Sequence, residues 1–207
     1  MPIQAVITAD IVNSTSLSNA QQKKLLKKLE QMLLPYKYEF YRGDSFQVFF
    51  KNAEQALQVA LQCRTAAIAL SQIEDNAITD VRISIGIAPT KNATKSLGAS
   101  TGDAFILSGR AFDEITSNHQ KLAITTLQPI AAEGLQVIAD YINAIFKTMT
   151  NKQAIVVFEL LQGKNQQLVA KKIKKSKSTI SQLVSAGRWV ETEKLLQHYH
   201  NIINLIQ

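Results

Sequence analysis

Residues 41–50, Tyr-Arg-Gly-Asp-Ser-Phe-Gln-Val-Phe-Phe, have the pattern of a tight turn followed by a strand. Gly43 can adopt the positive φ angle that a tight hairpin turn requires. Apolar side chains recur at every second position after the turn, at Phe46, Val48 and Phe50. The pattern predicts a β-hairpin with strands over 36–41 and 45–50, whose turn ends in the carboxylate of Asp44.

A nearly all-apolar run over residues 3–9 predicts a central strand that ends at Asp10. In a ferredoxin-like order of strand, helix, strand, strand, helix, strand, the first and third strands pair antiparallel. Asp10 and Asp44 would then meet at one sheet edge. Two such carboxylates repel unless a cation or a proton lies between them, and oxygen-only ligand sets favour Mg²⁺ or Mn²⁺. Alternatively, the pair only caps strand ends and binds no ligand.

Between these strands, Ser18 followed by Gln21 is the pattern of a capping box, which predicts a helix to about Leu34. The apolar stripe of this helix is opposed by four lysines, Lys23, Lys24, Lys27 and Lys28. This lysine face is either a phosphate-binding patch or a solvated helix face.

The next segments continue the alternation: a helix over 53–72, a strand over 81–88, a helix over 103–117 and a short strand over 122–126. A polar loop over 90–101 is either functional or a tolerated surface insertion. The single cysteine, Cys63, lies among apolar residues of the second helix and is predicted to be a buried apolar side chain rather than a reactive thiol.

Charge is distributed unevenly along the chain. Residues 1–146 contain 13 Lys+Arg and 13 Asp+Glu, whereas residues 147–207 contain 10 and 3, so the tail carries all of the net charge of +7. We therefore predict a neutral domain over 1–128, a connecting helix over 129–150 and a basic domain over 151–207 that meets a polyanion.

The basic tail has the pattern of a helix-turn-helix. Short helices are predicted over 153–161, over 166–173 and from 178 onward. In that geometry Ser178, Thr179 and Gln182 contact base edges, while Lys175 and Lys177 contact phosphates of DNA. The partial positive charge at the helix N-terminus adds to this attraction. The alternative is a basic three-helix bundle that binds only a protein.

Two segments leave the oligomeric state open. The connecting helix over 129–150 either bridges the domains or pairs with a second copy of itself. A long apolar stripe follows at Trp189, Leu195, Leu196, Ile202, Ile203, Leu205 and Ile206. This stripe either covers the core of the helix-turn-helix or joins two protomers, so that paired recognition helices reach two half-sites.

Four segments resemble, in order, the catalytic domain of class III nucleotide cyclases: residues 10–14, 42–46, 81–87 and 102–105, followed by Arg110. The chain more closely resembles the SatD family, in which a cyclase-like domain precedes a helix-turn-helix. The matching segments in the C-terminal part are Gln153, Leu168-Val169-Ala170 and 176–181. The resemblance implies an α+β fold, with a ferredoxin-like cyclase-type sheet and helices plus an all-α helix-turn-helix domain. It also implies a homodimer, because cyclase sites usually form between two chains.

The resemblance assigns roles to individual residues. Asp10 and Asp44 take the positions of the aspartates that hold two Mg²⁺ or Mn²⁺ ions during attack of a ribose 3′-hydroxyl on the α-phosphate. The nucleotide-binding positions are the backbone of Ile11, Val12, Asn13 and Ser14, with Arg42 and Gly43 of the hairpin turn. Arg110 takes the position of the transition-state arginine.

Three positions depart from the cyclase pattern. Ile106 replaces the asparagine that orients the ribose, and Phe40 and Ala99 replace the lysine and aspartate that select the base in adenylyl cyclases. An isoleucine side chain cannot hydrogen-bond a ribose. We therefore predict that metal and phosphate chemistry is retained, whereas sugar orientation and purine selection are lost or rebuilt.

Two hypotheses for the function follow. The first is a DNA-binding transcriptional regulator whose cyclase-like domain senses a metal-bound nucleotide, such as a nucleoside triphosphate, or another phosphate ligand. The second is an enzyme that forms a cyclic or oligomeric nucleotide. The N-terminus lacks a basic segment followed by a long apolar run, and no apolar stretch reaches 18 residues, so we expect a cytoplasmic protein without a membrane partner.

Overall fold

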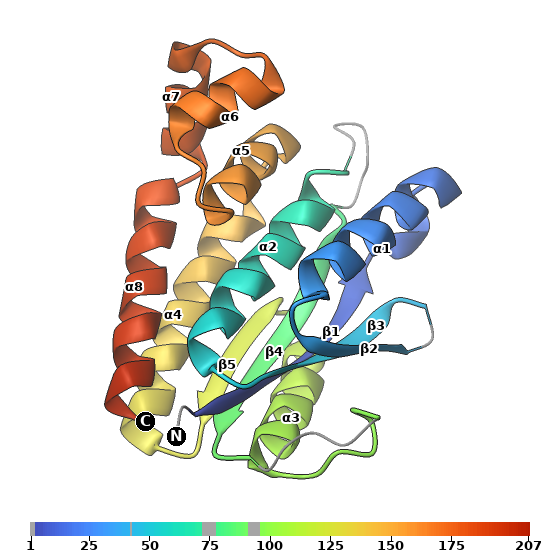
Figure 1. Ribbon diagram of the computed structural model, residues 1–207, viewed down its shortest axis with the longest axis vertical. Helices are drawn as coiled ribbons and strands as arrows, with labels where there is room; N and C mark the ends of the chain where they lie inside the picture. The colour runs from blue at the N-terminus through green and yellow to red at the C-terminus, as the bar shows by residue number, and fades with distance from the viewer. Residues whose placement is uncertain (1–2, 42, 72–77, 91–95) are drawn as a thin grey trace.

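The computed structural model describes residues 3–41, 43–71, 78–90 and 96–207 (Figure 1). The strands are β1 (Gln4–Val12), β2 (Lys37–Tyr41), β3 (Ser45–Phe50), β4 (Asp80–Ala88) and β5 (Leu122–Thr126). The α-helices are α1 (Asn19–Leu33), α2 (Ala56–Ile68), α3 (Asp103–Ser117), α4 (Pro129–Lys147), α5 (Asn151–Leu161), α6 (Gln166–Ile173), α7 (Lys177–Ala186) and α8 (Trp189–Leu205). Two short 3-10 helices are η1 (Ser14–Ser16) and η2 (Ala53–Gln55).

The strands form one mixed sheet in the order β2-β3-β1-β4-β5. β1 pairs antiparallel with β3 on one side and with β4 on the other, and β5 runs parallel to β4. The predicted antiparallel pairing of the first and third strands is therefore confirmed. In this register Asp10 lies opposite Ser45 of β3 and opposite Arg82 of β4. The α+β class predicted from the sequence is confirmed as well.

β1 is longer than predicted, because the strand does not stop at Asp10. Ile11 and Val12 continue to pair with β4, opposite Val81 and Asp80. Asn13 then ends the strand in the left-handed region at φ 57°, a conformation that asparagine tolerates better than most residues. Asp10 is therefore a residue within the strand and not the first residue of a loop.

Two layers of helices cover the sheet (Figure 1). Side chains at alternate positions of β1, Ala5, Ile7, Ala9 and Ile11, belong to the main core with α1, α2, α4, α5 and α8. Val6 points to the other face, where it packs with Ala104 and Phe105 of α3. α3 approaches β4 so closely that a Cβ atom added at Gly86 would lie 2.3 Å from the carbonyl oxygen of Ala104. Glycine at this position is therefore a packing requirement.

The capping box predicted for α1 is present. Ser18 Oγ accepts a hydrogen bond from the Gln21 backbone N–H, and the Gln21 side chain accepts one from the Ser18 N–H, which confirms the capping box. α2 ends at Ile68, earlier than predicted, because residues 69–71 tighten into turns. The Ser71 hydroxyl accepts the N–H of Thr79 at 2.9 Å, which directs the chain toward β4. The predicted end at Gln72 lies outside the described residues.

The C-terminal helices pack on the sheet part of the molecule. α5 contributes Ala154, Val157, Phe158 and Leu161 to the main core, and contributes Val156 and Leu160 to a second core with α6 and α7. α8 runs back along α4 toward the N-terminus (Figure 1), where the buried Tyr199 hydroxyl donates to the carbonyl oxygen of Ala53 at 2.6 Å. Because α5 serves both cores, the structure does not confirm the helix-turn-helix as a separate domain.

None of the helices in the described ranges is both long and apolar enough to span a membrane.

Candidate functional site

Asp10 and Asp44 meet at one sheet edge, as the predicted topology requires. The backbone N–H of Ile11 donates to the carbonyl oxygen of Asp44 at 3.1 Å, which joins β1 to the turn before β3. Burial is the main cause of the raised pKa of Asp10, and the Asp44 carboxylate raises this pKa further, so the two carboxylates interact electrostatically. The tertiary structure therefore brings together two acidic residues that are far apart in sequence.

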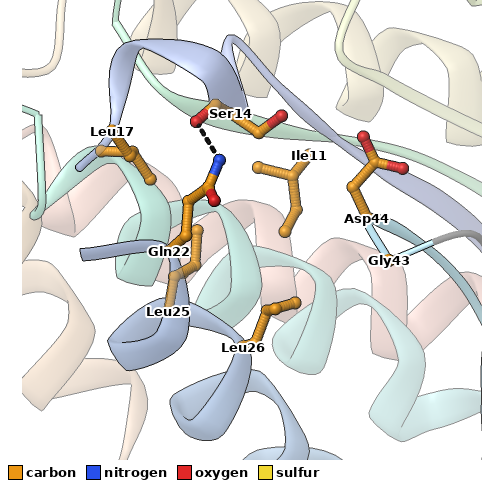
Figure 2. Close-up of a pocket in the computed structure, with 8 residues that line it drawn as sticks. All are labelled: Ile11, Ser14, Leu17, Gln22, Leu25, Leu26, Gly43 and Asp44. Atoms are coloured by element: carbon orange, nitrogen blue, oxygen red, sulfur yellow. Dashed lines mark hydrogen bonds between the residues drawn. The ribbon is translucent and has the colours of Figure 1, made fainter. Parts of the chain in front are cut away.

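A pocket of about 300 Å³ opens beside Asp44 (Figure 2). Its lining residues are Ile11, Ser14, Leu17, Gln22, Leu25, Leu26, Gly43 and Asp44. Ser14 and Asp44 lie at one end and the leucines of α1 at the other (Figure 2). The Gln22 amide donates to the Ser14 carbonyl oxygen at 2.7 Å and thereby holds the β1–α1 connection against α1. The pocket thus combines a carboxylate with an apolar wall.

The Asp10 side chain lies on the opposite face of β1 from this pocket, because Ile11 points into the main core. Its nearest cation is Arg82 across the sheet, with 3.6 Å between Arg82 Nε and Asp10 Oδ1. Both of these atoms are buried and have no hydrogen-bond partner in the described part of the chain. Burial raises the pKa of the Asp10 carboxyl above its usual value, and the Arg82 charge opposes that rise.

Lys121, immediately before β5, is the second cation at this edge. Burial lowers the pKa of the Lys121 ammonium, and the neighbouring Arg82 charge lowers it further. Asp10 favours the charged form of Lys121, so the two groups interact. Neither Arg82 nor Lys121 is among the site residues predicted from the sequence. Arg82 could have been found, since it is a charged residue among the apolar residues of a central strand.

Asp10 and Asp44 offer oxygen donors of the kind that a phosphate-bound Mg²⁺ ion takes, and of the two only Asp44 lines the pocket. Asp10 Oδ1 is a buried oxygen without a hydrogen bond among the described residues, and Asp44 supplies a second carboxylate nearby. Mg²⁺ is commonly held by one or two carboxylates, water and substrate phosphates. The described residues contain no group of three or more His, Cys, Asp or Glu side chains able to hold a metal ion. A cage made only of protein ligands is therefore not supported.

The other predicted nucleotide-binding residues have different environments. Ile11 is buried in the main core and Val12 is half-buried within β1. The Asn13 amide donates to the carbonyl oxygen of Ile78 at 2.9 Å, so it ties the β1–α1 connection to the segment before β4. Ser14 and Gly43, the latter at φ +85°, line the pocket. Arg42 lies outside the described residues.

Arg110 and Ile106 are exposed residues of α3. α3 covers the face of the sheet opposite to α1, so Arg110 does not line the pocket beside Asp44. The role of Arg110 stays a prediction.

Phe40, at the base-selecting position, packs against Phe46 with 5.2 Å between ring centroids. The neighbouring Glu39 accepts hydrogen bonds from the Tyr41 hydroxyl at 2.8 Å and from the Leu97 N–H at 2.6 Å. β2 thus anchors the loop that precedes α3.

The predicted DNA-binding residues lie at the start of α7. α6 ends at Lys174, whose φ of 54° produces the turn into α7. The Ser176 hydroxyl caps α7 by accepting the Thr179 N–H at 3.1 Å, and it also contacts the Thr179 hydroxyl at 2.9 Å. The side chains that remain exposed are those of Lys175, Lys177, Ser178 and Gln182. Ile180 and Val184 point inward to the second core, so α7 has one buried and one free face.

No family model and no curated protein matches this chain. Solved structures that it resembles include an active GGEEF domain of a diguanylate cyclase from Vibrio cholerae, with 14% identity over 61% of this chain and 84% of that chain and a TM-score of 0.42. Two structures of a bacterial light-regulated adenylyl cyclase match at 15% identity (60% and 76% of the chains, TM-score 0.42) and 16% identity (60% and 43%, TM-score 0.41). A likeness this low carries no conclusion about function, and membership of the SatD family stays a prediction.

Proposed function

We propose that this protein is a DNA-binding transcriptional regulator whose N-terminal sheet part senses a nucleoside triphosphate with its divalent cation. One observation carries the proposal: the exposed face of α7 presents Lys177, Ser178 and Gln182, while its other face packs on α5 and α6. A helix held in this way can enter the major groove without unfolding its own core.

Electrostatics supports the same assignment. The last 61 residues, 147–207, contain 10 Lys+Arg and only 3 Asp+Glu. Lys175 and Lys177 flank the capped N-terminus of α7, where the free N–H groups of the helix also attract phosphate. The expected division of roles is backbone contact by the lysines and base contact by Ser178, Thr179 and Gln182.

The sheet edge supplies the chemistry for a nucleotide ligand. Asp10 and Asp44 offer carboxylate oxygens to Mg²⁺ or Mn²⁺. Arg82 and Lys121 add positive charge beside Asp10, which suits the phosphates that would complete the metal shell. Asp10 Oδ1 and Arg82 Nε, which lie 3.6 Å apart and have no hydrogen bond among the described residues, would gain hydrogen-bond partners when such a ligand binds.

α1 provides a physical connection between the two parts. Gln22, Leu25 and Leu26 of α1 line the pocket beside Asp44. One turn later, the Lys28 ammonium lies 3.5 Å from the centroid of the Phe158 ring in α5. A ligand that shifts α1 would therefore act on the first helix of the helix-turn-helix, and its occupancy could change DNA affinity.

A binding-site selection with the full chain tests the proposal, run with and without nucleoside triphosphate and Mg²⁺. We expect a defined duplex sequence to be enriched, and the affinity for it to change when the ligand is added. Asp44→Asn should retain DNA binding and lose the response to the ligand. Failure to enrich any sequence under either condition would refute the regulator.

The second candidate is an enzyme that forms a cyclic or oligomeric nucleotide with two metal ions. The observation in its favour is the juxtaposition of Asp10 and Asp44 beside Arg82, because paired carboxylates and nearby cations suit phosphoryl transfer. Incubation of the purified protein with each triphosphate and Mn²⁺ decides this case. A product that depends on Asp44 would establish the enzyme, and the absence of any product would exclude it.

A further inference from the structure

The lysine face of α1 is not uniform. Lys23, Lys24 and Lys27 are exposed, whereas Lys28 is half-buried over the Phe158 ring at 3.5 Å. This cation–π contact joins the sheet part to α5. None of the ion pairs in the described part of the chain involves Lys28. The ammonium is therefore partly removed from water without a carboxylate partner.

The carboxylate nearest this cluster is already engaged by other lysines. The Glu159 side chain is only 8% exposed, and it accepts hydrogen bonds from Lys164 at 2.6 Å and from Lys172 at 2.7 Å. Burial lowers the pKa of Lys28, Glu159 opposes that change, and the charges of Lys172, Lys24 and Lys164 add to it. Lys164 and Lys172 thus pair with this carboxylate and Lys28 interacts with it at longer range, so three ammonium groups share one carboxylate and the cluster has excess positive charge.

A pocket of about 430 Å³ opens at this cluster between α1, α2, α5 and α6. Its lining residues are Lys28, Gln31, Met32, Gln62, Phe158, Glu159, Gln162 and Lys172. The volume lies in the range of small-ligand sites, about 300–1,000 Å³. Three glutamine amides supply hydrogen-bonding groups around the two lysines. The lining therefore carries two ammonium groups against the one carboxylate of Glu159, beside the apolar Met32 and Phe158, whereas the described lining of the Asp44 pocket contains no cationic side chain.

We propose that this pocket binds a small phosphate-bearing anion, with Lys28 and Lys172 as its cationic ligands. An anion there would give Lys28 the charged partner that it lacks, and charge-assisted hydrogen bonds are the stronger kind. A concave site walled by four helices admits a small molecule better than it admits the backbone of a duplex. The ligand would contact both the sheet part and the helix-turn-helix, so its binding should fasten α1 to α5 and α6.

This site is independent of the nucleotide site proposed above. The two pockets share no lining residue, although α1 contributes to both. The Asp44 pocket needs a divalent cation for its ligand, whereas the Lys28 pocket supplies its own positive charge. Removal of divalent cations therefore separates the two sites in an experiment.

The test uses the full chain in EDTA with inorganic pyrophosphate as the probe and sodium chloride at equal ionic strength as the reference. Calorimetry should show saturable binding of pyrophosphate, and thermal unfolding should show a higher Tm than in chloride. Lys28→Met, which keeps a long side chain over Phe158, should weaken pyrophosphate binding by about tenfold or more. Lys27→Met, an exposed neighbour on the same helix, should leave the affinity unchanged.

Further variants separate this proposal from the nucleotide-sensing proposal and from DNA binding. Asp44→Asn should bind pyrophosphate as well as the parent chain does in EDTA, even if the nucleotide-sensing proposal fails. If Lys28→Met does not fold, Lys172→Met takes its place. Equal binding in parent and variant, or equal losses in Lys27→Met and Lys28→Met, would overturn the proposal. So would a loss of duplex DNA affinity in Lys28→Met with pyrophosphate binding intact, because the lysine would then be a DNA contact.

Discussion

Arg64 of α2 and Asp80 of β4 form a buried bidentate ion pair, with Nε–Oδ1 and Nη2–Oδ2 distances of 3.1 and 2.7 Å. The Arg64 side chain is 1% exposed, also donates to Asn143 of α4 at 3.3 Å, and lies over the Phe146 ring at 4.6 Å. One guanidinium therefore joins a strand to two helices.

Removal of this guanidinium should strongly lower the free energy of unfolding. Arg64→Met leaves the Asp80 carboxylate buried and unpaired, which typically costs about 3–5 kcal/mol. Urea unfolding of the two proteins at neutral pH measures the difference. The double variant Arg64→Met with Asp80→Asn should recover part of the loss, because the buried charge is then gone. A loss below about 1 kcal/mol in the single variant would contradict the proposed importance of the pair.

Gly86 should be intolerant of even one added methyl group. In Gly86→Ala the new Cβ would lie 2.3 Å from the Ala104 carbonyl oxygen and 2.5 Å from the Ser108 nitrogen, so α3 would have to move away from β4. We expect a loss of at least about 1–3 kcal/mol in unfolding free energy. Gly109→Ala is the matched control within α3, since no atom lies within 4 Å of the added Cβ, and it should be neutral or stabilising.

The contribution of Glu159 to stability should depend on pH. Burial alone would raise the pKa of this carboxyl, but hydrogen bonds from Lys164 and Lys172 outweigh burial and lower the pKa below the ordinary 4.5. A lowered pKa means that the charged group stabilises the folded state above pH 4.5 and that this stabilisation is lost as pH falls through the lowered value. Glu159→Gln should therefore be less stable than the parent at pH 7, and the gap should narrow toward pH 3.

Denaturant unfolding at several pH values measures that gap. The matched control is Glu193→Gln, which removes the same charge from an exposed position of α8. A gap that widened as pH fell would show that Glu159 does not act through its lysine partners.

Phosphate contacts and base contacts at α7 should differ in their dependence on salt. Lys177→Ala should weaken binding to all duplexes about equally and reduce the slope of log K against log salt by about 1. Gln182→Ala should instead relax sequence preference by about 1–3 kcal/mol at one position and leave the salt slope unchanged. Titrations at several salt concentrations with the selected duplex and a scrambled duplex distinguish the two effects. Identical behaviour of both variants would argue against insertion of α7 into the groove.

Local patterns in the chain were sufficient for most of the secondary structure. The Ser18–Gln21 capping box and the hairpin around Gly43 were predicted and are present. A ferredoxin-like strand order was sufficient to predict the antiparallel pairing that places Asp10 beside the turn at Asp44. These features depend on residues close in sequence, or on a topology with few alternatives, so they can be predicted from the amino-acid sequence.

Tertiary structure alone decided the partners of the charged and aromatic groups. Arg82 becomes the neighbour of Asp10 because β1 and β4 pair in the register that sets these two residues opposite each other. The position of Lys28 over Phe158 depends on the packing of α5 against α2. The helices, the strands and the proximity of Asp10 to Asp44 can be read from the residues alone. Packing between distant segments determined burial, charge balance and both candidate pockets, because those properties belong to pairs of residues that no local pattern links.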